Sequence, residues 1–238
     1  MTVVIPTLNE EKNLPAVLAG LPPRLHELIV VDGHSKDETV ATAIRLWPDV
    51  VIIQQELTGK GDALAAGFAA ATGDIVVAMD GDGSTDPAEL PLFVDALVAG
   101  ADMAKGSRFL EAGGSDDLTR VRRIGARCLT GIVNFLFGTE YTDLCYGYTA
   151  FWRASLARVS TARGFEVETA MNISAAQAGL VVTEVPSFER ARVHGASNLR
   201  AVRDGLRILG LILSTRARPY KMPIPEPEAE PEAVMAGA

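Results

Sequence analysis

The sequence lacks two features that would assign it to a membrane-spanning or a disulfide-bonded class. No run of apolar residues approaches the roughly 20 that a membrane-spanning helix needs. Residues 2–5 have the pattern of a strand, so no signal peptide is expected. Only two cysteines occur in 238 residues, Cys128 and Cys145. Two cysteines make neither a disulfide framework nor a zinc site, so we expect packing roles for both and a cytoplasmic location.

Positive charge is scarce in the chain as a whole, and it is concentrated near the C-terminus. The formal net charge is −8. Residues 219–238 hold four glutamates and one lysine, whereas residues 188–218 hold seven arginines against Glu189 and Asp204. This balance does not favour nucleic acid as a partner. The basic segment could still meet a phosphate group or an anionic surface.

Strand and helix patterns alternate through the first half of the chain. Short β-branched runs predict strands, and longer periodic runs predict helices. The expected strands are 2–5, 27–31, 50–54, 75–79, 101–105, a strand and turn within 142–152, and 181–185; the expected helices are 10–19 with Asn9 as its cap, 35–46 with Ser35 or Asp37 as its cap, 61–71, 119–137, 167–178 and 199–217. This order predicts an α/β fold whose mostly parallel sheet carries helices on both faces. Ligands of such sheets bind at the carboxyl ends of the strands, where Asn9, Asp32 and Asp80 fall.

The segment after residues 75–79 carries the clearest chemistry. Asp80-Gly81-Asp82 places two carboxylates one residue apart where a buried strand would leave the sheet. Gly81 and Gly83 let the backbone turn sharply and approach a ligand closely. Carboxylate oxygens suit Mg²⁺ or Mn²⁺, which commonly take substrate phosphates as further ligands. A plain strand-ending turn is the alternative, because Asp and Gly are common turn residues.

An ordered set of motifs resembles family 2 glycosyltransferases. These motifs are Pro6-Thr7-Leu8-Asn9-Glu10, Val30-Val31-Asp32-Gly33, Gly59-Lys60-Gly61, Asp80-Gly81-Asp82 and Gly106-Ser107-Arg108, followed by Thr142-Asp143-Leu144, Gly147, Glu166/Glu168 and residues 192–198. Within that family the sequence is most similar to the dolichol- or polyprenyl-phosphate mannose and glucose synthases. The resemblance runs from residue 2 to about 215, and it implies a GT-A fold, the nucleotide-diphospho-sugar transferase fold.

The resemblance implies roles for the residues of the donor site. Pro6, Thr7, Glu10 and Gly81 would line the nucleotide sugar, and Asp32 would meet the base. A carboxylate can accept a hydrogen bond from a nucleobase N–H, although Asp32 also suits a turn. Lys60 would offset the diphosphate charge or lie in solvent. Asp80 and Asp82 would bridge a divalent metal, Mg²⁺ or Mn²⁺, to the diphosphate, with Asp82 as the direct ligand.

Arginines are the expected contacts for an acceptor phosphate, because a guanidinium matches phosphate geometry and stays charged. Arg108, Arg122 and Arg123 resemble acceptor-binding positions, and Arg192 matches an arginine of the late motif. The catalytic set is therefore predicted as Asp80, Asp82, Arg108, Arg122 and Arg192. A solvated helix face is the alternative for the basic run at 120–127.

The late motif departs from the family at one position. Asn198 stands where the family often has lysine, so a cationic contact is absent or supplied by a neighbour such as Arg200. His194 in the same motif is a candidate third metal ligand, although a lone histidine is more often structural.

The predicted reaction is an inverting, metal-dependent transfer of a hexose from UDP-glucose or GDP-mannose to a polyprenyl or dolichyl phosphate. No residue is clearly placed as a general base, and an ionised phosphate acceptor needs none. Glu166 and Glu168 would serve if the acceptor were a hydroxyl, or would simply lie in a solvated helix start. One alternative is a soluble family 2 enzyme with a small-molecule acceptor. Another is a sugar nucleotidyltransferase, whose glycine-rich phosphate loop is missing after the first strand.

Three segments are expected along the chain. Residues 1–198 would form the GT-A domain, 199–218 a basic amphipathic helix, and 219–238 a disordered tail rich in Pro, Glu and Ala. In the helix, one stripe contains Leu199, Val202, Leu206, Leu209 and Leu213, and the arginines lie on the other face. This stripe would pack on the domain, or the helix would lie peripherally on the cytoplasmic membrane surface near anionic headgroups.

Overall fold

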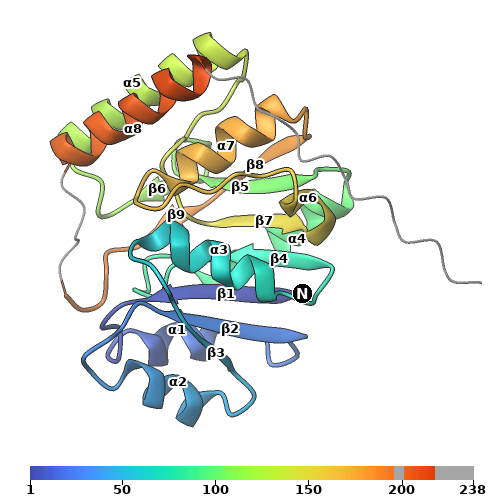
Figure 1. Cartoon of the computed structure of the whole chain (residues 1–238), viewed down its shortest axis with the longest axis vertical. Helices are drawn as coiled ribbons and strands as arrows, with labels where there is room; N and C mark the ends of the chain where they lie inside the picture. Colours follow the sequence, from blue (N-terminus) through green and yellow to red (C-terminus); the bar gives the residue numbers. More distant parts are fainter. Residues whose placement is uncertain (196–200, 218–238) are drawn as a thin grey trace, which may run out of the picture.

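A seven-stranded sheet forms the centre of the protein in the computed structural model, which describes residues 1–195 and 201–217 (Figure 1). Its strand order is β3-β2-β1-β4-β7-β5-β8. The strands are β1 Thr2–Thr7, β2 Glu27–Asp32, β3 Val51–Gln54, β4 Ile75–Ala78, β5 Met103–Ser107, β7 Thr149–Trp152 and β8 Val182–Pro186. Only β7 runs antiparallel to its neighbours, so the other strands all point the same way. The predicted mostly parallel sheet is confirmed.

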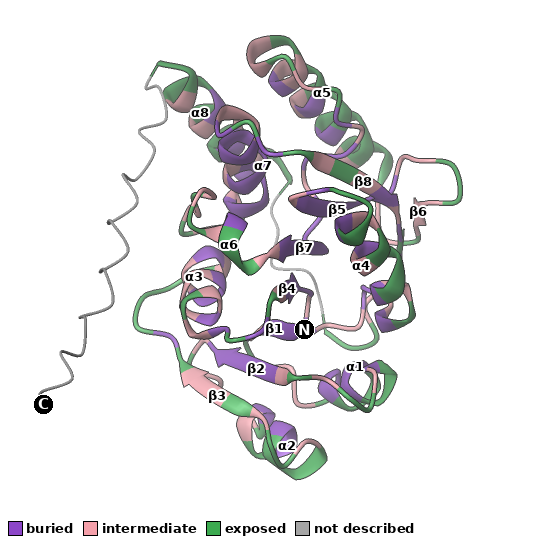
Figure 2. Ribbon diagram, turned by 90° about the vertical axis from the view of Figure 1, so that its right-hand side faces the viewer, coloured by how far each residue is buried: buried purple, intermediate pink, exposed green. Residues whose placement is uncertain are grey.

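Helices cover both faces of this sheet, as predicted. They are α1 Leu14–Gly20, α2 Thr39–Leu46, α3 Lys60–Ala70, a 3₁₀ turn Pro87–Glu89, α4 Leu90–Val98, α5 Arg120–Phe137, α6 Arg153–Leu156, α7 Val167–Gln177 and α8 Ala201–Ala217. Side chains of α1, α2 and α4 share one apolar core with the sheet. Side chains of α3 and α7 share a second core on the opposite face. Figure 2 shows the buried strands enclosed between these helices.

Two further helices form an outer layer beside α7. Val133 of α5 and Ile208 and Ile212 of α8 join Ile173 of α7 in a third apolar cluster. In Figure 1, α5 and α8 lie side by side at the top of the molecule, above α7. The helix predicted at 199–217 is therefore packed on the domain from Ala201 onward. No helix of the described residues is long and apolar enough to cross a membrane.

The face of α8 that packs is not the predicted leucine stripe. Asp204, Ile208 and Ile212 are the buried residues of this helix. Val202, Leu206 and Leu213 are more than half exposed. The correction has a simple reason: α8 carries apolar residues on two sides, and the sequence pattern alone does not say which side meets α7. Leu199, Asn198, Arg200 and the tail at 219–238 lie outside the described residues.

Several predicted boundaries were wrong. The first helix begins at Leu14, with Asn13 in the N-cap position, and Asn9 has a left-handed backbone with φ of 59° instead of capping it. Helix α4 was missed because Pro91 interrupts the apolar pattern, although proline fits the first turn of a helix. The 142–152 segment contributes only Thr149–Trp152 as strand, and the short strands β6 Gly114–Ser115 and β9 Phe188–Glu189 form a separate pair.

Helix α3 packs so closely on β1 and β2 that only glycine fits at one position. A Cβ atom on Gly67 would lie 2.3 Å from Val4 Cγ1 and 3.1 Å from Val31 Cγ2. Both valines are fully buried, so neither can move aside easily. The small residues of α3 thus bring the helix, and Lys60 at its start, close to the sheet.

We expect Gly67→Ala to lower the free energy of unfolding by about 1–3 kcal/mol, because the added methyl overpacks this contact. Gly131→Ala on α5 is the matched control, since no atom lies within 4 Å of its Cβ position. It should raise stability by about 0.5–1 kcal/mol, through the better helix propensity of alanine. Urea unfolding followed by circular dichroism measures both. Equal midpoints for the two variants would contradict the close packing.

Candidate active site

The sheet topology gathers the predicted site residues at one edge. Thr7 and Asp32 end β1 and β2, Asp80 follows β4, and Arg108 follows β5. Because β7 is antiparallel, its amino end lies at this same edge, and the segment 143–147 before it joins the site. The order of the strands reverses between β1 and β4, which is where ligands bind in open α/β sheets. A cleft of about 110 Å³ opens here, lined among others by Lys60, Asp80, Asp82, Ser84, Arg108, Arg122, Gly147, Phe165, Glu168, Arg192 and Ile208.

Lys60 lies between two carboxylates inside the cleft. Its Nζ is 2.5 Å from Asp80 Oδ1 and 2.7 Å from Glu168 Oε1. Burial alone would lower the pKa of Lys60, but the charges of Asp80 and Glu168 raise it above its ordinary value, so the ammonium stays protonated. The alternative of a lysine in solvent is therefore wrong, as is the alternative of a solvated position for Glu168.

Glycines make room for this ion triad. A Cβ on Gly147 would lie 2.5 Å from Lys60 Nζ, and a Cβ on Gly61 would lie 1.5 Å from the carbonyl oxygen of Ala162. Gly59, with φ of 113°, has a backbone conformation that other residues rarely adopt. The glycines around Lys60 thus serve close backbone packing that directs the lysine toward Asp80.

Arg192 holds the second aspartate. Its Nη2 is 2.7 Å from Asp82 Oδ2, and its Nη1 is 3.3 Å from Glu10 Oε1. Arg192 belongs to the segment after β9, more than a hundred residues from Asp82 in sequence. Asp82 Oδ1 also accepts a hydrogen bond from the Ser84 backbone N–H at 2.9 Å, which fixes the carboxylate in the turn.

Negative charge exceeds positive charge in this part of the cleft. Four carboxylates, from Glu10, Asp80, Asp82 and Glu168, share two cations, Lys60 and Arg192. The pKa of Glu10 is raised, chiefly by burial, with contributions from Asp82 and Asp80. The pKa of Asp80 is raised for the same reasons, with Lys60 opposing the shift. A raised carboxylate pKa indicates that the site would be stabilised by a further positive charge.

The donor atoms of this site fit a hard divalent cation. Asp80 and Asp82 provide carboxylate oxygens just after the carboxyl end of β4. Mg²⁺ typically binds one or two carboxylates together with substrate phosphates and water. Within residues 1–195 and 201–217, no three His, Cys, Asp or Glu side chains are arranged to hold a metal by themselves. His194 is therefore not gathered with the two aspartates, contrary to its predicted place as a third ligand.

Asn13, which the sequence interpretation missed, holds the segment that carries Arg192. Its Oδ1 accepts a hydrogen bond from the His194 backbone N–H at 2.9 Å, and its Nδ2 donates to the His194 carbonyl at 3.2 Å. The same Nδ2 donates to Glu10 Oε2 at 2.5 Å. Asn13 is buried, and it lies three residues after Glu10, the last residue of the first motif. The three-residue spacing from Glu10 was the one sequence feature that could have identified Asn13 as a site residue.

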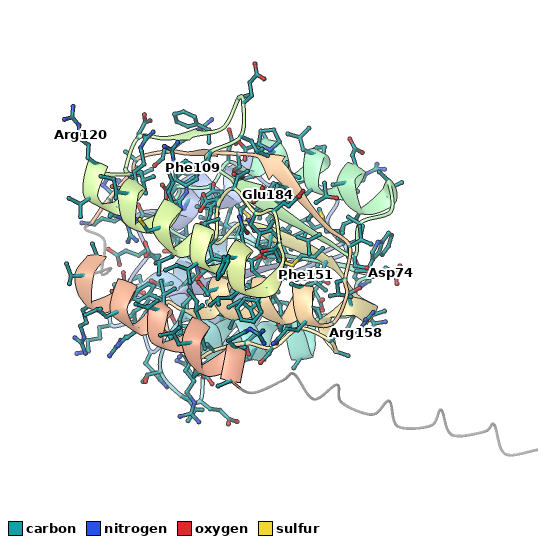
Figure 3. All side chains as sticks on the ribbon, turned by 90° about the horizontal axis from the view of Figure 1, so that it is seen from above. Asp74, Phe109, Arg120, Phe151, Arg158 and Glu184 are labelled. Carbon is teal, nitrogen blue, oxygen red and sulfur yellow. The ribbon has the colours of Figure 1, made fainter. Side chains whose placement is uncertain are left out.

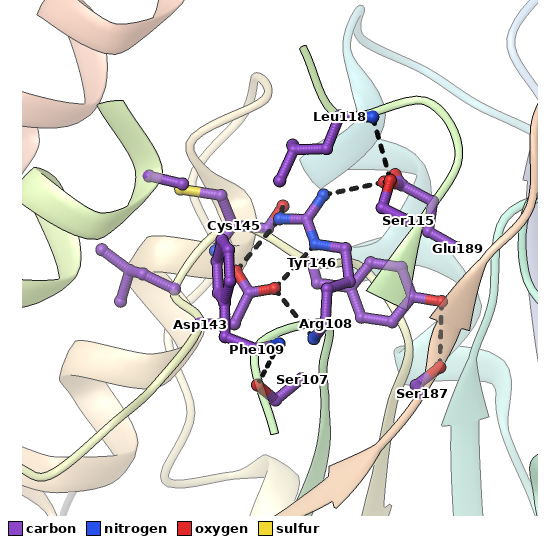
Figure 4. A network of polar contacts seen from close by, with 12 residues as sticks. Ser107, Arg108, Phe109, Ser115, Leu118, Asp143, Cys145, Tyr146, Ser187 and Glu189 are labelled. Carbon is purple, nitrogen blue, oxygen red and sulfur yellow. Dashed lines mark hydrogen bonds and ion pairs between the residues drawn. The ribbon is translucent and has the colours of Figure 1, made fainter. Parts of the chain in front are cut away.

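Arg108 has its donors turned toward protein carboxylates (Figure 4). Its Nε and Nη2 donate to the two oxygens of Asp143 at 2.7 and 3.0 Å, and its Nη1 donates to Glu189 at 3.1 Å. Burial alone would raise the pKa of Asp143, but Arg108 holds it below its ordinary value. This geometry disagrees with the prediction that Arg108 binds an acceptor phosphate directly. It makes Arg108 part of the cleft wall instead.

Lys105 extends this wall beneath the cleft. It is fully buried on β5, where its Nζ lies 2.7 Å from Glu184 Oε1 and also bonds the Asp143 carbonyl. The Tyr146 ring lies 5.0 Å from the Arg108 guanidinium, a cation–π contact. Asp143, Glu184 and Glu189 were not predicted as partners of these cations, because each comes from a different part of the chain.

Among the arginines of α5, Arg122 alone lines the cleft within the described residues. It pairs with Asp117 at 2.7 Å in a partly exposed position, so its guanidinium can be released to a ligand. Arg123 is exposed and does not line the cleft.

The remaining donor-site residues lie deeper than expected. Thr7 is buried, and its hydroxyl contacts the Val31 carbonyl at 3.3 Å. Asp32 is also buried, and its carboxylate accepts from the Ser35 backbone and hydroxyl and from Gln54 Nε2. Asp32 therefore orders the turn after β2 in this structure. Pro6 is half-buried, and a Cβ atom on Gly81 would lie 3.1 Å from both Ile5 Cγ2 and Thr7 Cγ2.

The sheet, its covering helices and the paired aspartates at the carboxyl edge together define a glycosyltransferase of the GT-A fold. The chain belongs to glycosyl transferase family 2, whose family model matches residues 2–160. Glycosyltransferase AglJ of Haloferax volcanii is 31% identical over 220 residues, which cover 91% of this chain and 71% of AglJ. Polyprenol monophosphomannose synthase of Mycolicibacterium smegmatis is 34% identical over 212 residues, covering 83% of this chain and 80% of that protein.

A solved structure supports the same fold. The crystal structure of glucosyl-3-phosphoglycerate synthase from Mycobacterium tuberculosis, in complex with Mn²⁺, UDP and glucosyl-3-phosphoglycerate, superposes with a TM-score of 0.72. The identity is 27%, and the match covers 90% of this chain and 78% of that one.

We expect Asp143→Ala to lower the free energy of unfolding by about 3–5 kcal/mol, because it leaves Arg108 charged and buried without its main partner. Asp117→Ala removes the partner of the partly exposed Arg122 and should cost no more than about 1 kcal/mol. Urea unfolding of both variants separates the buried pair from the partly exposed one. A small loss for Asp143→Ala would show that the wall does not depend on this ion pair.

Asn13→Ala should loosen the segment that carries Arg192. With its hydrogen-bond acceptor gone, the His194 amide should exchange with deuterium roughly fivefold faster, since each lost bond contributes about 1 kcal/mol. Asn13→Asp keeps an acceptor for that amide and should show a smaller change, and Asn134→Ala, which removes a bond to Tyr141, is a distant control. Unchanged exchange at 193–195 in Asn13→Ala would contradict this function of Asn13.

Proposed function

We propose that the enzyme transfers a hexose from a nucleotide-diphosphate sugar to a polyprenyl or dolichyl phosphate, working peripherally at the cytoplasmic membrane surface. The observation that carries the proposal is the charge around the two aspartates: Glu10, Asp80, Asp82 and Glu168 share the two cations Lys60 and Arg192, and Arg122 lines the same cavity as the aspartates. The carboxylate side suits a metal–diphosphate pair, and the arginine side suits a second phosphate.

Asp80 and Asp82 would hold Mg²⁺ or Mn²⁺, which when bound would stabilise the negative charge on the departing nucleoside diphosphate. Crystal structures of glucosyl-3-phosphoglycerate synthase with Mn²⁺ or Mg²⁺ and UDP support a divalent metal. In this chain Lys60 and Arg192 neutralise the two aspartates. If a metal bound with the donor neutralised the two aspartates instead, Lys60 and Arg192 would lie beside the diphosphate. There they would also stabilise the negative charge on the departing nucleoside diphosphate.

The acceptor is proposed to be a phosphate because every carboxylate that lines the cleft is ion-paired. Glu168 is the obvious carboxylate, and it is held by Lys60 at 2.7 Å. A phosphate monoester is already ionised at neutral pH, so its oxygen can attack the anomeric carbon once it is positioned. Direct attack opposite the leaving diphosphate would invert the anomeric configuration. The name of polyprenol monophosphomannose synthase supports a lipid phosphate as the acceptor.

A soluble phosphorylated acceptor is the second candidate. The neighbouring structure of glucosyl-3-phosphoglycerate synthase favours it, because its product carries a phosphate on a small acid. Arg122 could serve either acceptor, so the class of acceptor has to be measured. Membership of family 2 leaves the sugar nucleotidyltransferase alternative without support.

The test supplies the full chain with radiolabelled UDP-glucose or GDP-mannose and either polyprenyl phosphate or 3-phosphoglycerate. We expect label in the lipid extract, abolished by EDTA and restored by Mn²⁺. Asp82→Ala should lower the rate roughly 100-fold or more. Asp95→Ala, on the exposed side of α4, should leave it unchanged.

Label in the water-soluble phosphorylated product alone would establish the second candidate. Transfer that persists in EDTA would contradict the metal role. No product from either acceptor with any common nucleotide sugar would contradict both candidates.

A further inference from the structure

The outer layer formed by α5 and α8 exposes an unusual amount of apolar surface. Among the described residues, the large apolar side chains more than 60% exposed are Val98 on α4 and five residues of these two helices. Those five are Val121, Ile124, Phe135, Val202 and Leu206, of which Phe135 is 87% exposed. Isolated exposed apolar residues are common, but a concentration on two adjacent helices marks an interaction surface.

These residues form one stripe along each helix. At 100° per residue, Val121, Ile124, Cys128 and Phe135 fall within one narrow sector of α5, opposite its buried residues Ala126, Thr130 and Val133. On α8, Val202, Leu206 and Leu213 fall in one sector beside the buried Ile208 and Ile212. Figure 3, seen from above the two helices, shows them lying next to each other across this face.

The flanks of both stripes are positively charged. Six exposed arginines belong to the two helices: Arg120, Arg123, Arg127, Arg203, Arg207 and Arg216. Arg120 projects outward from the start of α5 in Figure 3. Helix α5 contains no acidic residue, and the one acid of α8, Asp204, is buried and lies 3.7 Å from Arg207. The face as a whole is therefore basic, on a chain whose net charge is −8.

We infer that this α5–α8 face docks on an anionic lipid bilayer. Apolar stripes flanked by arginine match the boundary between acyl chains and anionic headgroups. The charge argues against another copy of this chain as the occupant, because two such faces would bring like charges together. Each arginine near an anionic surface strengthens binding roughly five-fold, so several acting together would suffice for stable association.

The cleft lies on the inner sides of the two helices whose outer sides form the docking face. Arg122 of α5 and Ile208 of α8 line the cleft, so the two helices form both the docking face and one wall of the site. An enzyme with a lipid-phosphate acceptor has to reach the bilayer, and this functional reason for a docking face rests on the proposed function. The vesicle experiment itself needs neither donor nor acceptor.

The full chain is sedimented with vesicles of phosphatidylcholine containing 30% phosphatidylglycerol, and with vesicles of phosphatidylcholine alone. We expect at least tenfold stronger binding to the anionic vesicles, lost in 0.5 M NaCl because salt screens exposed charges. The triple variant Arg123→Glu, Arg127→Glu, Arg203→Glu should abolish binding. The charge-matched control Arg24→Glu, Arg45→Glu, Arg153→Glu changes exposed arginines outside α5 and α8 and should bind far better than the test variant.

The apolar stripe is tested separately. Ile124→Ser with Phe135→Ser should weaken binding about tenfold, whereas Ile44→Ser with Val98→Ser, exposed on α2 and α4, should not. In a Cys145→Ser chain, Cys128 is the one remaining thiol, and a polarity-sensitive dye attached to it should shift to the blue on anionic vesicles. Cys145 is half-buried and the other substituted side chains are exposed, so thermal unfolding should confirm that each variant remains folded.

Equal binding to neutral and anionic vesicles, or equal loss in the two triple variants, would overturn the inference. So would a dimer in vesicle-free sedimentation that Ile124→Ser with Phe135→Ser dissociates, because a second copy would then cover the face. Vesicle binding without sugar transfer would leave the docking face intact and count against the proposed function alone.

Discussion

The site depends on one electrostatic constraint: the half-buried carboxylates at the carboxyl end of β4 need positive charge beside them. Lys60 and Arg192 each supply one such charge, at 2.5 Å from Asp80 and 2.7 Å from Asp82. Glu10 and Glu168 share the same two cations, which leaves the cleft short of positive charge. Burial raises the pKa of Glu10 and of Asp80, and the charge of Asp82 raises both further. The two cations come from distant parts of the chain. The glycines around Lys60 hold the first in place, and the hydrogen bonds of Asn13 hold the segment that carries Arg192.

A second set of charges builds the opposite wall. Arg108 and Lys105 are buried on and after β5, and they are balanced by Asp143, Glu184 and Glu189. Breaking such a pair is costly because the remaining charge stays in a low-dielectric interior. The wall is therefore rigid, and Arg122 at its edge remains the arginine of α5 that can turn toward a ligand. Within one cleft, Arg108 therefore stabilises the wall, whereas Arg122 is available to bind a ligand.

Helices α5 and α8 connect the cleft to the outer surface of the protein. Their inner sides pack on α7 through Val133, Ile208 and Ile212. Their outer sides carry exposed apolar residues and exposed arginines. One pair of helices thus forms a cleft wall and an exposed basic face. This arrangement explains how an acidic chain can present positive charge beside its site without spreading it over the whole molecule.

The sequence by itself determined the sheet, the strand ends and the aspartates that follow β4, because apolar periodicity and glycine turns are local properties. It also determined the family, since the motifs keep their order along the chain. Only the tertiary structure decided the partners of Arg108, Lys60 and Arg192, because these ions pair with residues tens to more than a hundred positions away. The same holds for α8, whose two apolar sides look equally suitable until α7 and α5 cover Ile208 and Ile212. Local patterns fix which residues can be buried, whereas packing against distant elements decides which of them are.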